Sequence, residues 1–329
     1  MTTINPLHFR SELGATEAKE LFKNSVKNIE IAISSFCNRR CTYCPNSLHD
    51  RRSKHIYMND ELFDQLMYEL AEIEYDGRIA LHRYNEPLAN PEYALKRIWQ
   101  IRAMIPKAEI WIYSNGDYLT PKLINALEKS GISQLLVTSH ALPKDQQFET
   151  IQGRMHARLK KIGLPYQDHG LSQDRSEHWI SVQTNSQMQH QWRAINFKAH
   201  DSEGHLKMSD RGESLNIQTT FIRSSPCLIP FTEMQIEYDG SVWPCCNVHS
   251  DVPEHQAYLM GKISPSDSLF SVYTNKTFVQ WRKSLFDFGE KEKPCKTCNF
   301  IPGSLPIEAK EQVQKIRQEF GLNPQQQQI

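Results

Sequence analysis

The chain has 329 residues, of which 39% are hydrophobic, and its 38 Lys and Arg residues balance its 38 Asp and Glu residues. This length predicts roughly two domains with a buried core, and zero formal net charge excludes a nonspecific nucleic-acid binder or a polybasic membrane protein. The N-terminus lacks the apolar region of a secretory signal, and no stretch approaches the roughly 20 apolar residues of a membrane span. We therefore expect a cytoplasmic protein.

Short apolar segments alternate with helical patterns over residues 28–200. Strands are predicted at 28–35, 78–84, 108–114, 133–139, 179–185 and 194–200. A helix is predicted to begin at Asn59-Asp60-Glu61, and others are predicted at 91–104, 121–130 and 145–162. This order predicts parallel strands joined by crossover helices, either as an open doubly wound sheet or as an incomplete barrel. In both folds the chemistry lies at the C-terminal ends of the strands.

The second part of the chain has a different pattern. Residues 164–178 and 201–226 are polar and aperiodic, so we expect loops near an active-site mouth or a domain junction. The segment 232–246 predicts a hairpin that turns at Asp239-Gly240, and helices are expected at 275–288 and 306–321. Residues 323–329 are expected to form a frayed tail.

The eight cysteines fall into two groups, and positions 45–226 between the groups contain none. Clustered cysteines in a chain without a secretory signal more often bind metals than form disulfides. In the first group, Cys37, Cys41 and Cys44 supply three thiolates that one loop can wrap around an inorganic centre. A structural zinc site uses four protein ligands, whereas a 4Fe-4S cluster held by three cysteines leaves one iron free to bind a substrate.

This spacing after an opening strand resembles the radical S-adenosylmethionine (SAM) superfamily. The resemblance implies an α/β fold, a partial (β/α)6 TIM-like barrel, with a 4Fe-4S cluster on Cys37, Cys41 and Cys44. In that superfamily SAM binds the open iron, and one electron from the cluster cleaves it to a 5′-deoxyadenosyl radical. A one-electron reductase of the flavodoxin or ferredoxin type is then an implied partner.

The resemblance also assigns cofactor contacts. Glu86 and Pro87 match the Gly-Gly-Glu-Pro-like turn after the second strand, although Tyr84 and Asn85 replace its glycines. The residues expected to contact SAM are Tyr43, Asn85, Glu86, Asn115 and Ser139. The alternatives are a solvated aromatic residue for Tyr43 and ordinary capping or turn residues for Asn115 and Ser139.

The second cysteine group provides a complete ligand set. Cys227, Cys245, Cys295 and Cys298 offer four thiolates, whose spacing alone suits either zinc or a 4Fe-4S cluster. The surrounding hairpin, the Pro-Cys-Cys segment and the closing C-x2-C resemble the SPASM and twitch auxiliary-cluster domains, which implies one auxiliary 4Fe-4S cluster in a small α+β domain. Adjacent cysteines on a strand point to opposite faces, so only one of Cys245 and Cys246 is expected to be a ligand. We assign Cys245, with Cys246 as the alternative.

These expectations divide the chain into an N-terminal extension (1–27), a radical SAM barrel (28–220), an auxiliary cluster domain (221–304) and a C-terminal helix and tail (305–329). The arrangement most resembles dehydrogenases that oxidise an alcohol carbon of a sugar or aminocyclitol, with the auxiliary cluster as electron acceptor. The alternatives are a peptide maturase that crosslinks or epimerises a ribosomal peptide, and a non-catalytic zinc-binding protein. Candidates for the proton acceptor lie near strand ends and are His82, Arg83, Tyr84, Tyr113 and, as the favoured one, His140.

Overall fold

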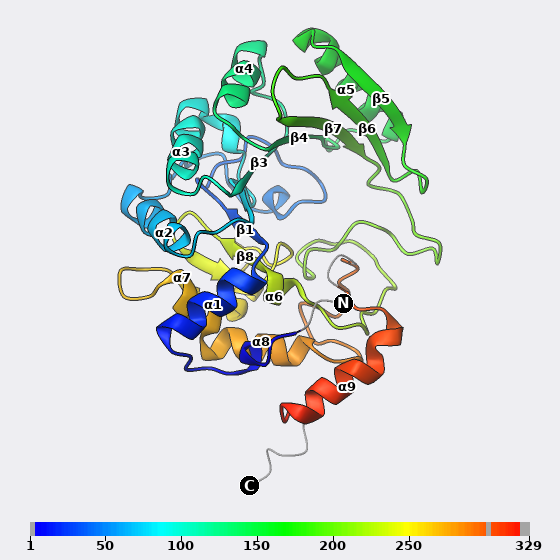
Figure 1. The fold of residues 1–329 in the computed structure, drawn as a ribbon. Helices are drawn as coiled ribbons and strands as arrows, with labels where there is room; N and C mark the ends of the chain where they lie inside the picture. The colour runs from blue at the N-terminus through cyan, green and yellow to red at the C-terminus, as the bar shows by residue number, and fades with distance from the viewer. Residues whose placement is uncertain (1–3, 301–303, 323–329) are drawn as a thin grey trace.

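The computed structural model describes residues 4–300 and 304–322, so the predicted tail at 323–329 lies outside the described residues. A ten-stranded sheet runs through the molecule in the order β10-β9-β8-β1-β2-β3-β4-β7-β6-β5 (Figure 1). The strands are β1 (Asn28–Ile31), β2 (Arg78–Ala80), β3 (Glu109–Ser114), β4 (Gln134–Ser139), β5 (Tyr166–Leu171), β6 (Glu177–Val182), β7 (Gln189–Ile195), β8 (Glu233–Ile236), β9 (Ser241–Trp243) and β10 (Gly261–Lys262).

The central strands of this sheet are parallel. Strand β1 pairs in parallel with β2 and β8, and the parallel run continues through β3 and β4 to β7. All six residues of β4 are buried, as expected for a strand that helices or loops cover on both faces. The predicted α/β class, a partial barrel with a small C-terminal region, is confirmed.

Helices follow the strands in the predicted order. They are α1 (Ala15–Ser25), α2 (Asp60–Glu72), α3 (Pro91–Met104), α4 (Pro121–Lys129), α5 (Phe148–Ile162), α6 (Ile229–Thr232), α7 (Leu269–Thr274), α8 (Lys276–Leu285) and α9 (Lys310–Glu319). The expected start of α2 is confirmed, because the Asn59 side chain accepts a hydrogen bond from the backbone N–H of Glu61. Asn90 and Thr120 cap α3 and α4 in the same way.

Three expectations about the later strands are wrong. Residues 164–178 were expected to be a loop, but they contain the edge strand β5, whose polar and mostly exposed residues give no apolar alternation. Strand β6 runs antiparallel to both β5 and β7, so no crossover helix joins it to its neighbours. Strand β7 lies at 189–195 rather than 194–200, and its buried positions are held by His190, Trp192 and Ala194.

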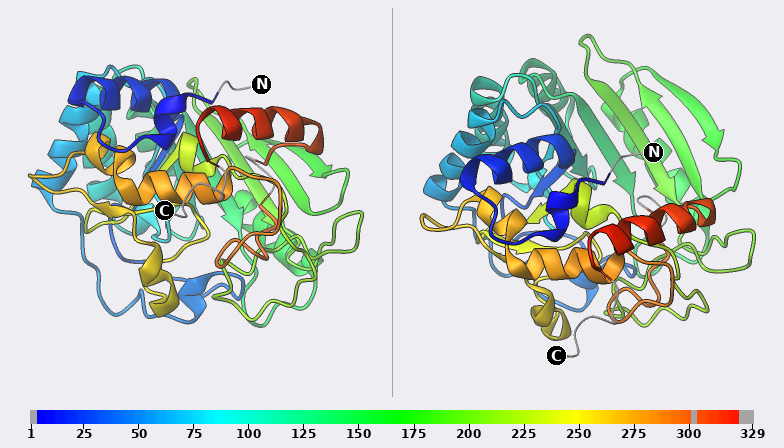
Figure 2. Two further views of the ribbon diagram at one scale, coloured as in Figure 1. Left: turned by 90° about the horizontal axis from the view of Figure 1, so that it is seen from below. Right: turned by 60° about the horizontal axis from the view of Figure 1, so that its bottom comes forward.

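The C-terminal part of the chain extends the same sheet. The predicted hairpin is confirmed as β8 and β9, which turn at Asp239-Gly240. Gly240 has a φ of +86°, and a Cβ there would lie 2.8 Å from the Ile263 carbonyl oxygen, so the turn requires glycine. Figure 2 shows α1, α8 and α9 together on the underside of the molecule, where Phe9, Phe286 and Val313 share a small apolar core. Among the described residues, no helix combines the length and apolar character that a membrane crossing needs.

Candidate active site

The first cysteine loop follows β1 directly, at the end of the parallel sheet where polar loops gather. Cys41 is buried, Cys37 and Cys44 are half-buried, and all three are free thiols. Burial raises the pKa of Cys37 to about 12, and burial followed by the neighbouring Cys44 raises the pKa of Cys41 further. These buried thiols would become thiolates through coordination to a metal centre, which deprotonates its cysteine ligands.

The loop is fastened to the loop after β3. Arg39 forms a two-pronged ion pair with Asp117, at 2.6 and 2.7 Å. Asn115 donates from its side chain to Asn38 Oδ1 at 2.8 Å and accepts from the backbone N–H of Asp117 at 2.9 Å. Asn115 therefore positions the cysteine loop from the end of the third strand.

Glu86 lies at the centre of this sheet end and is 3% exposed. Its carboxylate accepts from the Ser114 hydroxyl at 2.8 Å and from the backbone N–H groups of Asn115 at 2.7 Å and Leu88 at 3.1 Å. Burial raises the pKa of Glu86 to about 7, although these three donors oppose the shift. Glu86 thus joins the ends of β2 and β3 and places a carboxylate beside the cysteine loop.

Arg83 and Tyr84 connect this site to the second cysteine group. Arg83 binds the buried Glu237 carboxylate at 2.6 Å and donates to the backbone carbonyls of Cys245 and Val248. The Tyr84 hydroxyl donates to the Cys246 carbonyl, and its ring lies 4.1 Å from the His249 ring. The turn expected to hold SAM is therefore also the surface on which the second cysteine segment docks.

Asn85 completes this turn. Its Oδ1 accepts from the backbone N–H of Arg83 at 2.9 Å, which stabilises the bend without a glycine. Its side chain is buried, at 7% exposure. Tyr84 and Asn85, which depart from the Gly-Gly pattern, thus have defined structural contacts of their own.

Of the remaining predicted residues, Tyr43 and His140 contact each other, and Ser139 links two elements of the fold. The Tyr43 hydroxyl is hydrogen-bonded to His140 Nδ1 at 2.7 Å, and Tyr43 lines an apolar depression with Phe197 and Met208. Burial, followed by the Arg39 charge, lowers the pKa of His140 to about 3, so His140 is neutral at physiological pH. Ser139 is fully buried and its hydroxyl donates to the Ile151 carbonyl at 3.2 Å, which links β4 to α5.

His82 and Tyr113 lie side by side at the sheet end, with ring centroids 4.3 Å apart. Burial, followed by the Arg193 charge, lowers the pKa of His82 to about 3. Its Nδ1 is buried and has no hydrogen-bond partner among the described residues. Of the candidate proton acceptors, His82 is therefore neutral and has a free ring nitrogen.

The second cysteine group forms one cavity. Its lining includes Cys227, Cys245, Cys246, Cys295 and Cys298 together with Arg223 and Trp281. Burial raises the pKa of Cys245 well above its usual value, and the neighbouring Cys295 and Cys298 add to the shift. Burial likewise raises the pKa of the Cys246 thiol well above its usual value. The charged groups near it include Cys245, Glu30 of β1 and Arg211. The charged neighbours of Cys245 are thus the other cysteines of this group, whereas those of Cys246 include a residue of the barrel.

Sequence reasoning missed Arg211, in the loop at 201–226. It lies within electrostatic reach of groups from both cysteine regions: Tyr43, Cys44, Tyr84 and Cys246. Among the described residues it has no carboxylate partner, and its guanidinium donates to Asn247 Oδ1 at 3.0 Å. Asn247 in turn donates to Cys298 Sγ at 3.3 Å, so one hydrogen-bonded chain joins the space between the sites to an auxiliary cysteine.

The backbone around Arg211 is strained. Arg211 and Glu213 have φ values of +53° and +67°, in the left-handed region that non-glycine residues rarely adopt. Gly212 lies between them, and its carbonyl accepts a hydrogen bond from His255 Nε2 at 2.8 Å. Two strained non-glycine residues on either side of Gly212 mark this loop in the fold, but their sequence does not predict the strain.

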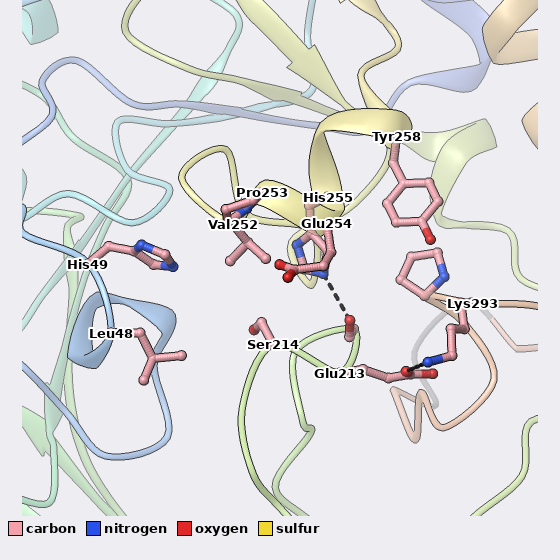
Figure 3. Close-up of a pocket in the computed structure, with 12 residues that line it drawn as sticks. Leu48, His49, Glu213, Ser214, Val252, Pro253, Glu254, His255, Tyr258 and Lys293 are labelled. Carbon is pink, nitrogen blue, oxygen red and sulfur yellow. Dashed lines mark hydrogen bonds and ion pairs between the residues drawn. The ribbon is translucent and has the colours of Figure 1, made fainter.

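Figure 3 shows the cavity beside this strained loop, with a volume of about 460 Å³. Four segments line it: Leu48 and His49 after the first cysteine group, residues 212–214, residues 252–255 with Tyr258, and Lys293-Pro294. Glu213 pairs with Lys293 across the cavity, whereas Glu254 is exposed and has no ion-pair partner among the described residues. The cavity thus combines carboxylates, histidines and an apolar wall.

Comparison with known proteins agrees with this geometry. The model of the radical SAM superfamily matches residues 31–165, and the model of the SPASM iron-sulfur cluster-binding domain matches residues 227–299. The chain belongs to the radical SAM superfamily and carries a C-terminal SPASM domain. It is a SAM-dependent iron-sulfur oxidoreductase, and membership of this superfamily removes the non-catalytic alternative.

Similar proteins cover most of this radical SAM chain. It is 29% identical over 276 residues to the S-adenosyl-L-methionine-dependent 2-deoxy-scyllo-inosamine dehydrogenase of Niallia circulans, covering 83% of this chain and 92% of that protein. The crystal structure of BtrN in complex with AdoMet and 2-DOIA is 26% identical, with a TM-score of 0.54 over 79% of this chain and 87% of that chain. An open conformation of BtrN gives 24% identity and a TM-score of 0.53 over 85% and 95% of the two chains, which supports the fold.

Proposed function

We propose that this enzyme oxidises an alcohol carbon of an aminocyclitol or a related sugar-like molecule to a carbonyl group. The likeness to the 2-deoxy-scyllo-inosamine dehydrogenase and to BtrN with 2-DOIA supports this substrate class. The observation that carries the proposal is the direct contact between the two cysteine regions, in which Arg83 and Tyr84 bind the carbonyls of Cys245 and Cys246. A substrate bound between the two cysteine groups would therefore lie close to both of them.

The first cysteine group is proposed to hold the SAM-binding 4Fe-4S cluster through Cys37, Cys41 and Cys44. With SAM bound there, reductive cleavage supplies the 5′-deoxyadenosyl radical that takes a hydrogen atom from the alcohol carbon. The substrate radical would then lose its hydroxyl proton to a base, for which His140 is proposed, and one electron to the auxiliary cluster, which would leave a carbonyl. A flavodoxin- or ferredoxin-like reductase is the proposed source of the initiating electron.

Cofactor contacts are proposed for Tyr43, Asn85, Glu86, Asn115 and Ser139. Glu86 offers a buried carboxylate for the SAM ammonium group, and Tyr43 offers an apolar wall for the adenine. Asn85 and Asn115 shape the turns around these groups. The buried Ser139 would act through β4 and α5, because its hydroxyl is held by the Ile151 carbonyl.

The second group is proposed to hold an auxiliary 4Fe-4S cluster through Cys227, Cys245, Cys295 and Cys298. Among the described residues, no three cysteine sulfurs lie within 4.8 Å of one another. A tetrahedral zinc site, with Zn–S distances near 2.3 Å, would bring its sulfurs to about 3.8 Å from one another. The sulfurs are thus farther apart than a zinc site requires, which favours the proposed iron-sulfur cluster, a group able to accept the electron that the substrate loses.

Arg211 is the residue we propose to bind the substrate hydroxyl groups. Its guanidinium faces both cysteine regions and lacks a carboxylate partner among the described residues, so its remaining donors are available to a polar ligand. Glu254, at the edge of the neighbouring cavity, is suited to the ammonium group of an aminocyclitol.

The decisive experiment uses 2-deoxy-scyllo-inosamine with deuterium at each alcohol carbon in turn. After anaerobic reconstitution with iron and sulfide, the enzyme should transfer one deuterium to 5′-deoxyadenosine and form one equivalent of ketone. Arg211→Met should raise the substrate KM at least about tenfold, as expected for a lost charge-assisted hydrogen bond, whereas Arg211→Lys should retain part of the affinity. Formation of 5′-deoxyadenosine without deuterium transfer from any aminocyclitol or sugar alcohol would contradict the proposal and favour a peptide substrate.

A further inference from the structure

Two histidines and an aspartate meet at the end of the sheet opposite to the one that carries the SPASM region. His156 lies on α5, Asp168 on the edge strand β5, and His178 on β6. Figure 1 shows these three elements together at the top of the molecule, and the sheet order places β5 and β10 at opposite edges. One ligand atom from each of the three side chains lies within 4.8 Å of the other two.

Local backbone structure brings the three side chains together. A register shift between Asp168 and Gly170 interrupts the pairing of β5 with β6, and such bulges redirect side chains. Asp168 is opposite Ile180, so His178 lies two residues from its partner and on the same face of the hairpin. Helix α5 covers this face and contributes His156.

The polar atoms are arranged as a set of ligands. Asp168 Oδ1 accepts from His178 Nε2 at 2.6 Å and from the Gly170 backbone N–H at 2.8 Å. Its second oxygen, Oδ2, faces His156 Nε2 at 3.5 Å. The side chains of His156 and Asp168 are 35% and 40% exposed, whereas that of His178 is 11% exposed, so the cluster has one open side.

We propose that His156, Asp168 and His178 bind a divalent metal ion of the zinc class. Two imidazole nitrogens and one carboxylate oxygen are a ligand set that zinc prefers, and the open side leaves the fourth position for water. Small rotations of the side chains would exchange the His178–Asp168 hydrogen bond for two bonds to the metal. No cysteine takes part, so this site is separate from both iron-sulfur regions.

A neighbouring glutamine supports the orientation of His178. Gln152 is one helical turn before His156 on α5, and its side-chain amide lies 2.6 Å from His178 Nδ1. Metal-binding histidines usually donate from the other ring nitrogen to a nearby acceptor. With the Gln152 amide turned so that its oxygen faces the ring, Nδ1 would donate to it while Nε2 binds the metal.

The metal is expected to hold the edge strand β5 in place. The residues of β5 are almost all exposed, and β5 is paired on one side only, so little besides β6 holds it. A metal bound by Asp168 of β5 and His156 of α5 would fasten this edge strand to the helix beneath it.

The first test is the zinc content of the reconstituted holoenzyme after incubation with zinc chloride and removal of unbound metal. The wild type should retain about one more zinc per chain than His156→Ala or Asp168→Asn, with equal iron in all three. His169→Ala is the matched control, because His169 neighbours Asp168 but contacts Ser181 at 2.9 Å instead. Zinc bound by stray cysteines would be equal in all four proteins, and equal zinc contents overturn the proposal.

Hydrogen exchange gives a second readout that does not depend on total metal. At zinc concentrations about 100 times the dissociation constant, exchange through opening of the hairpin should slow about 100-fold at residues 166–171. The slowing should occur in the wild type and in His169→Ala but not in His156→Ala. Exchange that zinc leaves unchanged in the wild type would mean that the cluster is a hydrogen-bonded His–Asp pair without a metal.

Discussion

Replacing Glu237 with Gln should destabilise the junction between the barrel and the SPASM region. The Glu237 side chain is 1% exposed and lies between two buried guanidiniums, Arg83 at 2.6 Å and Arg51 at 3.4 Å. Asp251 binds Arg51 at 2.8 Å, so the wild-type group contains two positive and two negative charges. Glu237→Gln leaves this group with one uncompensated positive charge.

The size of the effect follows from which arginine loses its partner. Arg51 keeps Asp251, whereas Arg83 loses the one carboxylate with which it forms an ion pair among the described residues and keeps the carbonyls of Cys245 and Val248. Removing one partner of a buried pair costs about 3–5 kcal/mol, and the retained amide oxygen and carbonyls place this variant near the lower value, at about 3 kcal/mol. In Glu237→Gln/Arg83→Met the charges balance again, so the double variant should lose less than the sum of the single losses.

Anaerobic urea denaturation, followed by circular dichroism, measures these free energies. The matched control is Glu72→Gln, which removes the exposed ion pair with Lys19 and should change the free energy of unfolding by less than about 1 kcal/mol. If Glu237→Gln unfolds at the same urea concentration as Glu72→Gln, the buried charge group does not stabilise the junction, and this reasoning is refuted.

Three further predictions concern the cysteines, acid stability and the docking tyrosine. Cys245→Ser should lose the auxiliary iron, about four per chain for a 4Fe-4S cluster, whereas Cys246→Ser should keep it; iron analysis showing the reverse would make Cys246 the ligand. Burial, followed by the Arg282 charge, lowers the pKa of His8 to about 3, so its stabilising contribution is complete above pH 6.5 and is lost as the pH falls from 6.5 towards 3. His8→Gln should therefore reduce the pH dependence of the unfolding free energy in this range by up to about 1.4 kcal/mol per pH unit, and identical slopes for both proteins would exclude this cause. Tyr84→Phe should lower stability by about 1 kcal/mol, the usual value of one hydrogen bond, and an unchanged urea midpoint would show that the contact with the Cys246 carbonyl contributes nothing.

The parts of the fold that sequence predicts are those in which burial has a simple period. The first four strands, the helices from α2 to α5 and the β8–β9 hairpin have apolar residues at regular spacing or a strong turn signal, and all were predicted. Strand β5 was not predicted because an exposed edge strand has no buried face, so its sequence shows no alternation of apolar and polar residues. Strand β7 was displaced because His190 and Trp192 fill its interior, and histidine does not count as apolar in such patterns.

The part of the candidate site that follows from the spacing of cysteines along the chain was predictable. Cysteines three or four residues apart must lie on one loop, so Cys37, Cys41 and Cys44, and likewise Cys295 and Cys298, were visible as sets before the fold was known. Cys227 and Cys245 were added to the second group through its resemblance to the SPASM domain. Contacts between distant segments were not visible: Arg83 meets Glu237 154 positions along the chain, and Arg211 enters the site through a backbone conformation that its sequence does not specify. Arg83, one of the candidate proton acceptors, binds Glu237 at this junction.

The two departures from the glycine-rich turn therefore have one physical explanation. Glycines at these positions would supply backbone freedom, but they have no side chains with which to bind a second segment. In this chain the Tyr84 side chain reaches the Cys246 carbonyl and the Asn85 side chain holds the bend that glycine would otherwise allow. The same turn thus contacts both cysteine regions, because the Tyr84 carbonyl accepts from the Asn46 side chain at 2.8 Å and the Tyr84 hydroxyl donates to the Cys246 carbonyl.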